Sequence, residues 1–290
     1  MTVAPMDYTR FRIPSDKQVR IEDYDPGATW GYKGKEEAQA KLAKDIGEMA
    51  ELQNVLYASR AHAVLILLQA MDTAGKDGVI KHVMSGVNPQ GVRVTSFKAP
   101  SEEELLHDYL WRCTKALPER GMIGIFNRSH YEEVLIARVH PEVLAREGIS
   151  QARKREWKLR YQEINEFERR LARNGTVILK FALNLSKAEQ RRRLLERIER
   201  KEKNWKFSFG DIKERRHWNK YRQAYEAMFN HTSTEWAPWY FVPADHKWYT
   251  RMVIAGVVVA TLKGLRLRYP ELSDEQKELL AEGKKMLRGS

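Results

Sequence analysis

Short apolar runs alternate with amphipathic segments along most of the chain, and this alternation constrains the fold most strongly. We expect strands at residues 64–69, 92–97, 122–126, 176–183 and 239–242. We expect helices at 35–60, 75–84, 101–116, 150–173, 253–267 and 274–287, and a further helix that Ser186 and Glu189 cap after the fourth strand. The pattern predicts an α/β fold: a five-stranded parallel sheet with helices on both faces, a three-layer α/β/α sandwich.

The chain shows no internal repeat and no clear linker, so we expect one domain over residues 1–290. Residues 1–34 are rich in turn formers and predict an irregular N-terminal arm on the body. Residues 199–230 are the candidate subdomain, inserted between the fourth and fifth strands.

Positive charge is concentrated in one stretch. The net charge is +12, and residues 187–222 hold fourteen Lys or Arg against six Asp or Glu. Such an excess indicates a polyanionic partner: nucleic acid, an acidic membrane surface or a phosphate-rich molecule. The alternative is a solvated helix face with ion pairs one turn apart.

Cysteine usage and the N-terminus bear on location. Cys113 is the single cysteine, which argues against a disulfide scaffold and fits a reducing compartment. The first ten residues contain no apolar core of a signal peptide, and the apolar run 252–262 is too short to span a bilayer. We therefore expect a cytoplasmic protein without a membrane partner.

The loop after the first strand carries the strongest functional signal. It reads Ala70-Met71-Asp72-Thr73-Ala74-Gly75-Lys76-Asp77-Gly78 and leads into a helix. Backbone N–H groups at such a helix start bind phosphate, and Lys76 adds a positive charge. Ala70 and Asp77 depart from the usual phosphate-binding (P-loop) motif, and an ordinary turn is the alternative. Two carboxylates beside a phosphate site require a compensating cation, for which Mg²⁺ is the usual choice.

The loop after the third strand complements this one. It begins Asn127-Arg128-Ser129-His130-Tyr131-Glu132. In nucleotide kinases a polar residue here reaches Mg²⁺, and an arginine contacts the transferred phosphoryl group. Because ligands of parallel sheets bind at the carboxyl ends of the strands, we expect Asn127 and Arg128 to face the first loop.

Several unusual strings resemble the family-2 polyphosphate kinases. They are QAMDTAGKDGVIKHVMSGVNPQGVRVTSFKAPSEEELLHDYLWR, GIFNRSHYEEVL, NWKFSFGDIKERRHWNKY and TSTEWAPWYFVPADHKWYTR, which together cover most of residues 64–251. Asn127, His130 and Glu132 resemble the class III branch, which implies transfer from inorganic polyphosphate to both AMP and ADP. The resemblance also implies a thymidylate-kinase-like P-loop fold with a basic helical lid at 199–230, and a homo-oligomer, either a dimer or a tetramer.

Site residues follow partly from the resemblance and partly from position. Asp72, Lys76 and Arg128 would be catalytic, and Asp72 and Asn127 would hold Mg²⁺. The residues expected to bind polyphosphate are Ala74, Gly75, Lys76, Asp77, Gly78, Lys81, Lys213, Arg215, Arg216 and Lys220. Those expected at the nucleotide are Arg93, Phe97, Lys98, Arg112, Asn127 and Glu132. For Phe97 the alternative is a core position, and for Arg112 it is an ion pair.

Two competing functions stay open at this point. One is an ATP-dependent nucleoside monophosphate kinase with the same sheet and a different donor. The other is a non-enzymatic nucleic-acid-binding protein that uses the basic stretch. The first would require ATP, and the second would tolerate loss of the Asp72 carboxylate.

Overall fold

The structure is a computed structural model that describes residues 6–145 and 154–289. One sheet contains five strands in the order β2-β3-β1-β4-β5, and all four neighbouring pairs are parallel. The strands are β1 (Ala63–Ala70), β2 (Val92–Ser96), β3 (Ile123–Asn127), β4 (Thr176–Asn184) and β5 (Trp239–Pro243). The predicted α/β fold is confirmed.

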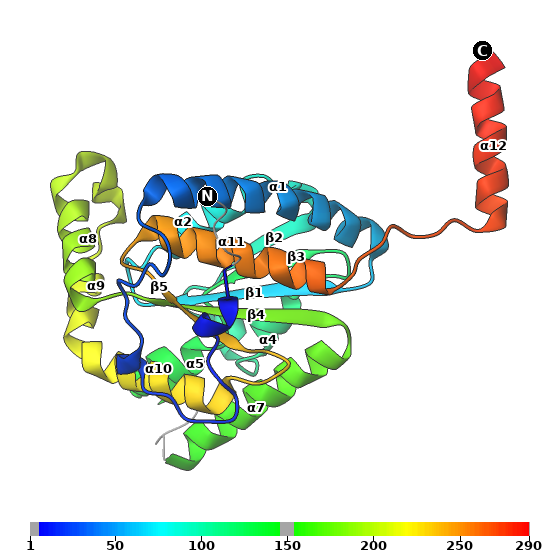
Figure 1. The fold of residues 1–290 in the computed structure, drawn as a ribbon. Coiled ribbons are helices and arrows are strands. Elements are labelled where there is room, and N and C mark those ends of the chain that lie inside the picture. The colour runs from blue at the N-terminus through cyan, green and yellow to red at the C-terminus, as the bar shows by residue number, and fades with distance from the viewer. Residues whose placement is uncertain (1–5, 146–153, 290) are drawn as a thin grey trace.

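Helices cover both faces of the sheet (Figure 1). On one face α1 (Lys35–Ser59), α2 (Lys76–Val83) and α11 (Lys247–Gly264) pack against alternate β1 residues such as Ile66. On the other, α5 (Glu132–Val139), α7 (Lys154–Arg173) and α10 (Trp218–Thr232) pack against the intervening ones, such as Leu67. Because successive strand residues point to opposite faces, β1 is buried along its whole length.

The remaining helices are short or peripheral. They are α3 (Glu102–Leu105), α4 (Trp111–Lys115), α6 (Glu142–Ala145), α8 (Lys187–Glu199), α9 (Phe209–Glu214) and α12 (Asp274–Gly289). In the part of the chain that the structure describes, no helix combines the length and the apolar character that crossing a membrane requires.

Residues 11–13 run along the edge of the sheet beside β5. The Ile13 amide donates to the Trp239 carbonyl at 2.8 Å, and Arg12 forms an isolated antiparallel bridge with Tyr240. Phe11 and Ile13 are fully buried, so this segment completes the core as well as lying on it.

Two predicted helices need correction. The helix expected at 101–116 is two helices, α3 and α4, with Leu106–Leu110 between them. Ser101 and Glu104 do form the predicted capping box, but the Asp108 side chain accepts from the Leu110 amide and turns the chain. The helix expected from residue 253 begins at Lys247 and ends at Gly264. The predicted start of α7 at residue 150 lies outside the described residues.

Candidate functional site

The loop after β1 is shaped around the start of α2. Gly75 has φ +110° and Thr73 has φ +67°, so both adopt the left-handed region and turn the chain sharply. Lys76 reaches back along the loop, and its Nζ donates to the Ala70 carbonyl at 2.9 Å. Burial, reinforced by the nearby Arg128 guanidinium, lowers the pKa of Lys76 to about 8. The ammonium group of Lys76 is therefore poorly solvated.

The loop after β3 lies directly beside the first one, because β1 and β3 are neighbours and Leu68 is in register with Asn127. Arg128 has φ +65°, and its amide donates to the Leu68 carbonyl at 3.0 Å. The turn aims its guanidinium at two carboxylates, Asp72 at 2.9 Å and Glu132 at 3.2 Å. Although burial opposes it, these carboxylates raise the pKa of Arg128. The guanidinium is permanently charged.

A buried polar network supports this second loop from behind. Lys180 on β4 donates to Glu168 at 2.6 Å and to the Tyr131 hydroxyl at 2.8 Å, and the Tyr131 hydroxyl donates to Glu168 at 2.7 Å. All three side chains are buried. Tyr131 precedes Glu132 at the start of α5, so the network fixes the backbone that presents Arg128 and Glu132.

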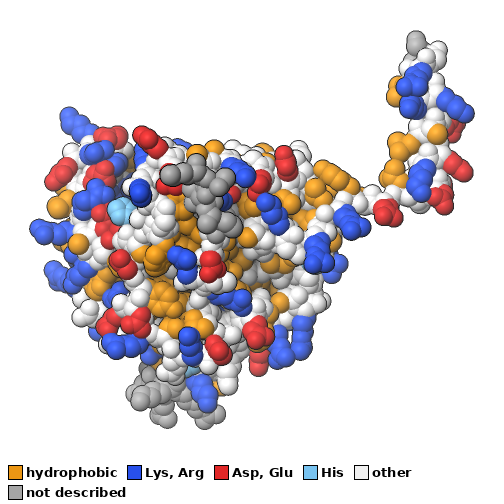
Figure 2. All heavy atoms as spheres, in the orientation of Figure 1, with side chains coloured by type: hydrophobic (Ala, Val, Ile, Leu, Met, Phe, Trp, Pro, Cys, Tyr) orange, Lys and Arg blue, Asp and Glu red, His pale blue; other side chains and the backbone are white. Residues whose placement is uncertain are grey.

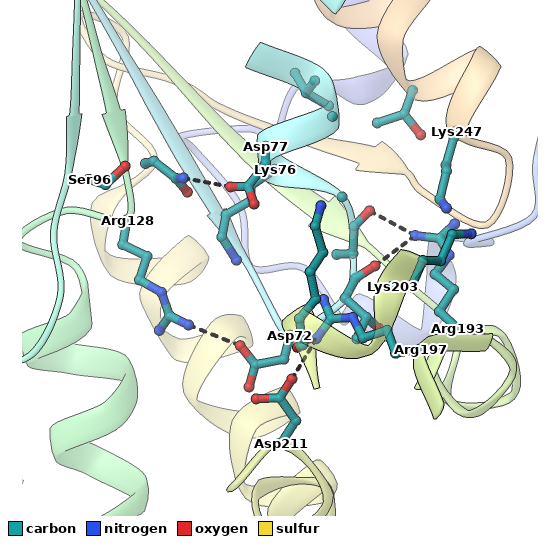
Figure 3. A pocket seen from close by; sticks show the side chains of 18 of the residues that line it. Asp72, Lys76, Asp77, Ser96, Arg128, Arg193, Arg197, Lys203, Asp211 and Lys247 are labelled. Atoms are coloured by element: carbon teal, nitrogen blue, oxygen red, sulfur yellow. Dashed lines mark hydrogen bonds and ion pairs between the residues drawn. The ribbon is translucent and has the colours of Figure 1, made fainter. Parts of the chain in front are cut away.

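Two cavities meet at the pair of Asp72 and Arg128, and among the described residues only these two line both. The larger is a cleft of about 600 Å³, and the smaller is a pocket of about 290 Å³. Figure 3 shows the larger one, with Arg128 on one side of Asp72 and Lys203 and Lys247 on the other. The ion pair thus forms part of the wall between two spaces.

The larger cleft is strongly basic. Nine Lys or Arg side chains and four carboxylates line it, including Lys203 and Lys206 from the segment after α8 and Lys247 and Arg251 from α11. A cleft with this excess of positive charge concentrates anions. The smaller pocket differs, because aromatic and aliphatic side chains from α5 and α10 form much of its wall, among them Ile136, Trp218 and Tyr225.

Arg193 on α8 fixes the floor of the cleft. Its guanidinium donates to the carbonyls of Thr73 and Ala74 in the first loop, and to those of Ala244 and Asp245 after β5. Glu189 binds the same guanidinium at 2.7 Å. This buried side chain therefore ties two loops together and holds the backbone of the loop after β1 in shape.

The oxygen atoms around Asp72 fit a magnesium ion that is also bound by phosphate. Asp72, Asp77 and Asn127 line the cleft, and the Asn127 amide nitrogen donates to Asp77 at 2.8 Å. The amide oxygen of Asn127 is therefore the atom that can face a cation. Among the residues described, no group of three or more carboxylate, histidine or cysteine side chains could hold a metal by itself. Mg²⁺ suits such a set, because it keeps several waters and takes phosphate oxygens as ligands.

Most of the predicted site residues come together, and some do not. The larger cleft holds Asp72, Ala74, Gly75, Lys76, Asp77, Gly78, Phe97, Lys98, Asn127 and Arg128. The smaller pocket adds Glu132 and Arg215. Neither cavity is lined by Lys81, Arg93, Arg112, Lys213, Arg216 or Lys220.

The residues outside the cavities have other contacts or face solvent. Arg93 lies 3.7 Å from Glu119 at the surface. Arg112 is buried, donates to the Lys98 carbonyl and lies near Glu133, which matches the ion-pair alternative. Lys81, Lys213, Arg216 and Lys220 are exposed.

Sequence reasoning missed several basic residues of the cleft, namely Arg193, Arg197, Lys203, Lys206, Lys247 and Arg251. Four of them, Arg193, Arg197, Lys203 and Lys206, belong to the basic stretch 187–222 that the sequence did single out. Lys247 and Arg251 follow a predicted strand closely, which places them near the carboxyl edge of the sheet, where ligands bind. This is a weaker indication than a motif. Asp211 also lines the cleft and pairs with Arg197 at 2.7 Å.

Comparison with known proteins agrees with this geometry. The profile of the family described as "Polyphosphate kinase 2" matches residues 32–269. An "ADP-polyphosphate phosphotransferase" of Rhodopseudomonas palustris is 48% identical, over 96% of this chain and 98% of that protein. An "AMP/ADP-polyphosphate phosphotransferase" of Meiothermus ruber is 45% identical, over 94% and 99% respectively. The crystal structure of polyphosphate kinase 2 from Arthrobacter aurescens is 42% identical with a TM-score of 0.87, over 96% of this chain and 98% of that one. The chain belongs to the polyphosphate kinase 2 family.

Proposed function

We propose that this protein transfers the terminal phosphoryl group of inorganic polyphosphate to AMP and to ADP, and so forms ADP and ATP. The observation that carries the proposal is the meeting of two unlike cavities at Asp72 and Arg128. A phosphotransferase needs one place for the donor, another for the acceptor, and fixed charges between them. The names of the relatives from R. palustris and M. ruber support the choice of donor and acceptors.

The donor occupies the larger cleft in this proposal. Polyphosphate carries about one negative charge per phosphate and has no bases to be recognised, so a basic channel without a base pocket suits it. Lys76 and the N-terminus of α2 face the reacting end of the polymer. Lys203, Lys206, Lys247 and Arg251 neutralise the phosphates further along the chain.

The acceptor occupies the smaller pocket. Trp218, Tyr221 and Tyr225 offer flat surfaces to a nucleobase, while Glu132 and Arg128 lie at the end next to Asp72. The α- or β-phosphate of the nucleotide then meets the donor at the shared wall. Of the residues predicted from the sequence to bind the nucleotide, Glu132 is the one in this pocket.

The chemistry is positioning and neutralisation. An anionic oxygen of the nucleotide attacks the terminal phosphorus, and the bond to the bridging oxygen of the polymer breaks, leaving a polymer shorter by one unit. Arg128 and Lys76 stabilise the charge on the transferred group. Mg²⁺ held by Asp72 and Asn127 would supply further neutralisation and orient the phosphates. Residues 199–230 line both cavities and act as the lid that excludes water.

The test is a donor assay without ATP. Purified protein is given Mg²⁺, long-chain polyphosphate and AMP, and ADP and ATP are followed by chromatography. We expect ADP first and ATP after it. Asp72→Asn, which keeps the size of the side chain, is the inactive control, and omission of Mg²⁺ is the second.

The possible outcomes separate the functions that the sequence left open. Activity that requires added ATP would identify a nucleoside monophosphate kinase. Product from ADP and none from AMP would keep the donor and withdraw AMP as an acceptor. The oligomeric state, the cytoplasmic location and the absence of a nucleic-acid partner stay predictions.

A further inference from the structure

Helix α8 connects the end of β4 to the lid and presents two unlike faces. Its exposed face includes Arg191 and Arg192, and Figure 2 shows Lys and Arg side chains at the surface over α8 and α9, on the left of the view. Its buried face consists of Gln190, Arg193 and Leu194, which lie within four residues of one another and share one side of the helix. Two of these three buried side chains are polar, so each requires a hydrogen-bonding partner.

The buried face of α8 holds the backbone of the loop after β1. Nε2 of Gln190 donates to the Asp72 carbonyl at 3.2 Å. The Arg193 guanidinium donates to the next two carbonyls, those of Thr73 and Ala74. Three consecutive carbonyls of the loop are thus bound from α8. Because the Asp72 carboxylate projects from the backbone that Gln190 holds, the position of this carboxylate depends on the Gln190 contact.

The other end of the Gln190 amide binds the lid. Its Oε1 accepts from Nη1 of Arg215 at 2.9 Å, and the same nitrogen donates to the Lys187 carbonyl at 2.7 Å. Arg215 lies within the lid segment, between α9 and α10, and lines the smaller pocket together with Gln190. Gln190 is only 4% exposed, so water competes little for either end of its amide. One amide group therefore joins the lid to the backbone of Asp72.

We propose that Gln190 is a positioning residue for phosphoryl transfer, and that it holds Asp72 in its reactive place only while Arg215 of the lid is bound to it. Arg215 fixes the amide oxygen, which aims the amide nitrogen at the Asp72 carbonyl. When the lid moves away, the oxygen loses its charged donor and the side chain is free to rotate. Transfer then depends on lid closure, which limits transfer to water. The inference deepens the proposed phosphotransfer and rests on it.

Steady-state kinetics of two Gln190 variants tests the contact with Asp72. Gln190→Met nearly keeps the size of the side chain but removes both hydrogen bonds. We expect kcat to fall by about ten- to a hundredfold while the KM for polyphosphate stays nearly unchanged, because a misplaced group acts on the transition state. Gln190→Glu still accepts from Arg215 but cannot donate to Asp72, so its kcat should fall as far. A normal kcat for Gln190→Glu, or a change confined to KM, would overturn the proposal.

A double-mutant cycle tests the coupling to the lid. Arg215→Met and Gln190→Met should each lower kcat, and the double variant should have a kcat close to that of the slower single variant. Arg191→Met is the matched control, because Arg191 is an exposed arginine next to Gln190 in the sequence. Any effect of Arg191→Met on kcat should simply multiply with that of Gln190→Met. If the effects of Arg215→Met and Gln190→Met also multiply, the lid does not act through Gln190 and the proposal is wrong.

Amide hydrogen exchange of the full chain gives a readout that does not require activity. Arg215→Met should speed exchange in a peptide that covers residues 71–76, but it should add nothing in Gln190→Met, where the loop is already released. Arg191→Met should leave this exchange unchanged. Loop exchange that does not respond to Arg215→Met would refute the coupling, even in an active enzyme. The expected exchange pattern in a protein that is inactive with polyphosphate would support the coupling and contradict only the proposed phosphotransfer.

Discussion

Replacing Lys76 by methionine should stabilise the unliganded protein while abolishing its activity. The pKa of Lys76 falls from 10.5 to about 8 in the folded state, chiefly through desolvation. One pKa unit corresponds to about 1.4 kcal/mol, so keeping the ammonium charged near pH 7 costs about 3 kcal/mol. Methionine removes that cost but leaves the Ala70 carbonyl without its donor, which costs about 1 kcal/mol. We expect the free energy of unfolding to rise by about 2 kcal/mol at pH 7.

The stability difference between the wild type and Lys76→Met should depend on pH. The unfolded chain holds the Lys76 proton up to about pH 10.5 and the folded protein only up to about pH 8. Between these values unfolding takes up a proton, so the stability of the wild type rises with pH. The advantage of Lys76→Met should therefore shrink from pH 7 to pH 10.

The assay is denaturant unfolding of both proteins at several pH values, without polyphosphate. Lys81→Met is the matched control, because Lys81 is exposed near the end of the same helix. It should change the free energy of unfolding by less than about 0.5 kcal/mol. A Lys76→Met protein less stable than the wild type at pH 7, or a difference that does not change with pH, would refute the reasoning.

Four further predictions concern the two cavities and their support. Arg128→Ala should lower the phosphotransfer rate by at least about two orders of magnitude, and near-normal turnover would remove it from the mechanism. Lys203→Ala with Lys206→Ala should raise the KM for long-chain polyphosphate and leave that for AMP nearly unchanged. Glu132→Gln should raise the KM for AMP and leave that for long-chain polyphosphate nearly unchanged. Steady-state kinetics with each substrate varied in turn therefore distinguishes the two cavities. Lys180→Met should lower the free energy of unfolding by about 3–5 kcal/mol, measured by denaturant titration, because the Glu168 carboxylate then stays buried without its cation.

The sheet and the central residues of the site could be predicted because the sequence patterns that indicate them are local. A short apolar run followed by small and charged residues marks a strand and its loop, and two such loops meet when their strands are neighbours. The side chains of Asp72, Lys76 and Arg128 were found in this way, and all three line the larger cleft.

The rest depends on contacts between distant parts of the chain. Arg193 binds the loops at Ala74 and Ala244, which lie 119 and 51 residues away from it in sequence. No local sequence pattern predicts such contacts. The break after α3 depends on the turn at Asp108, which a capping box at Ser101 does not predict. The early start of α11 was hidden because its first turns mix charged and aromatic residues.

The ion pairs of Arg128 have a consequence for turnover. Asp72 and Glu132 hold the guanidinium much as phosphate oxygens would. An incoming phosphoryl group therefore competes with two built-in anions, and it gains only the difference between its own attraction and theirs. The same competition acts on the product, since both carboxylates can reclaim the guanidinium as soon as the transferred group leaves. The ion pairs of Arg128 therefore weaken the binding of a phosphoryl group and speed its release.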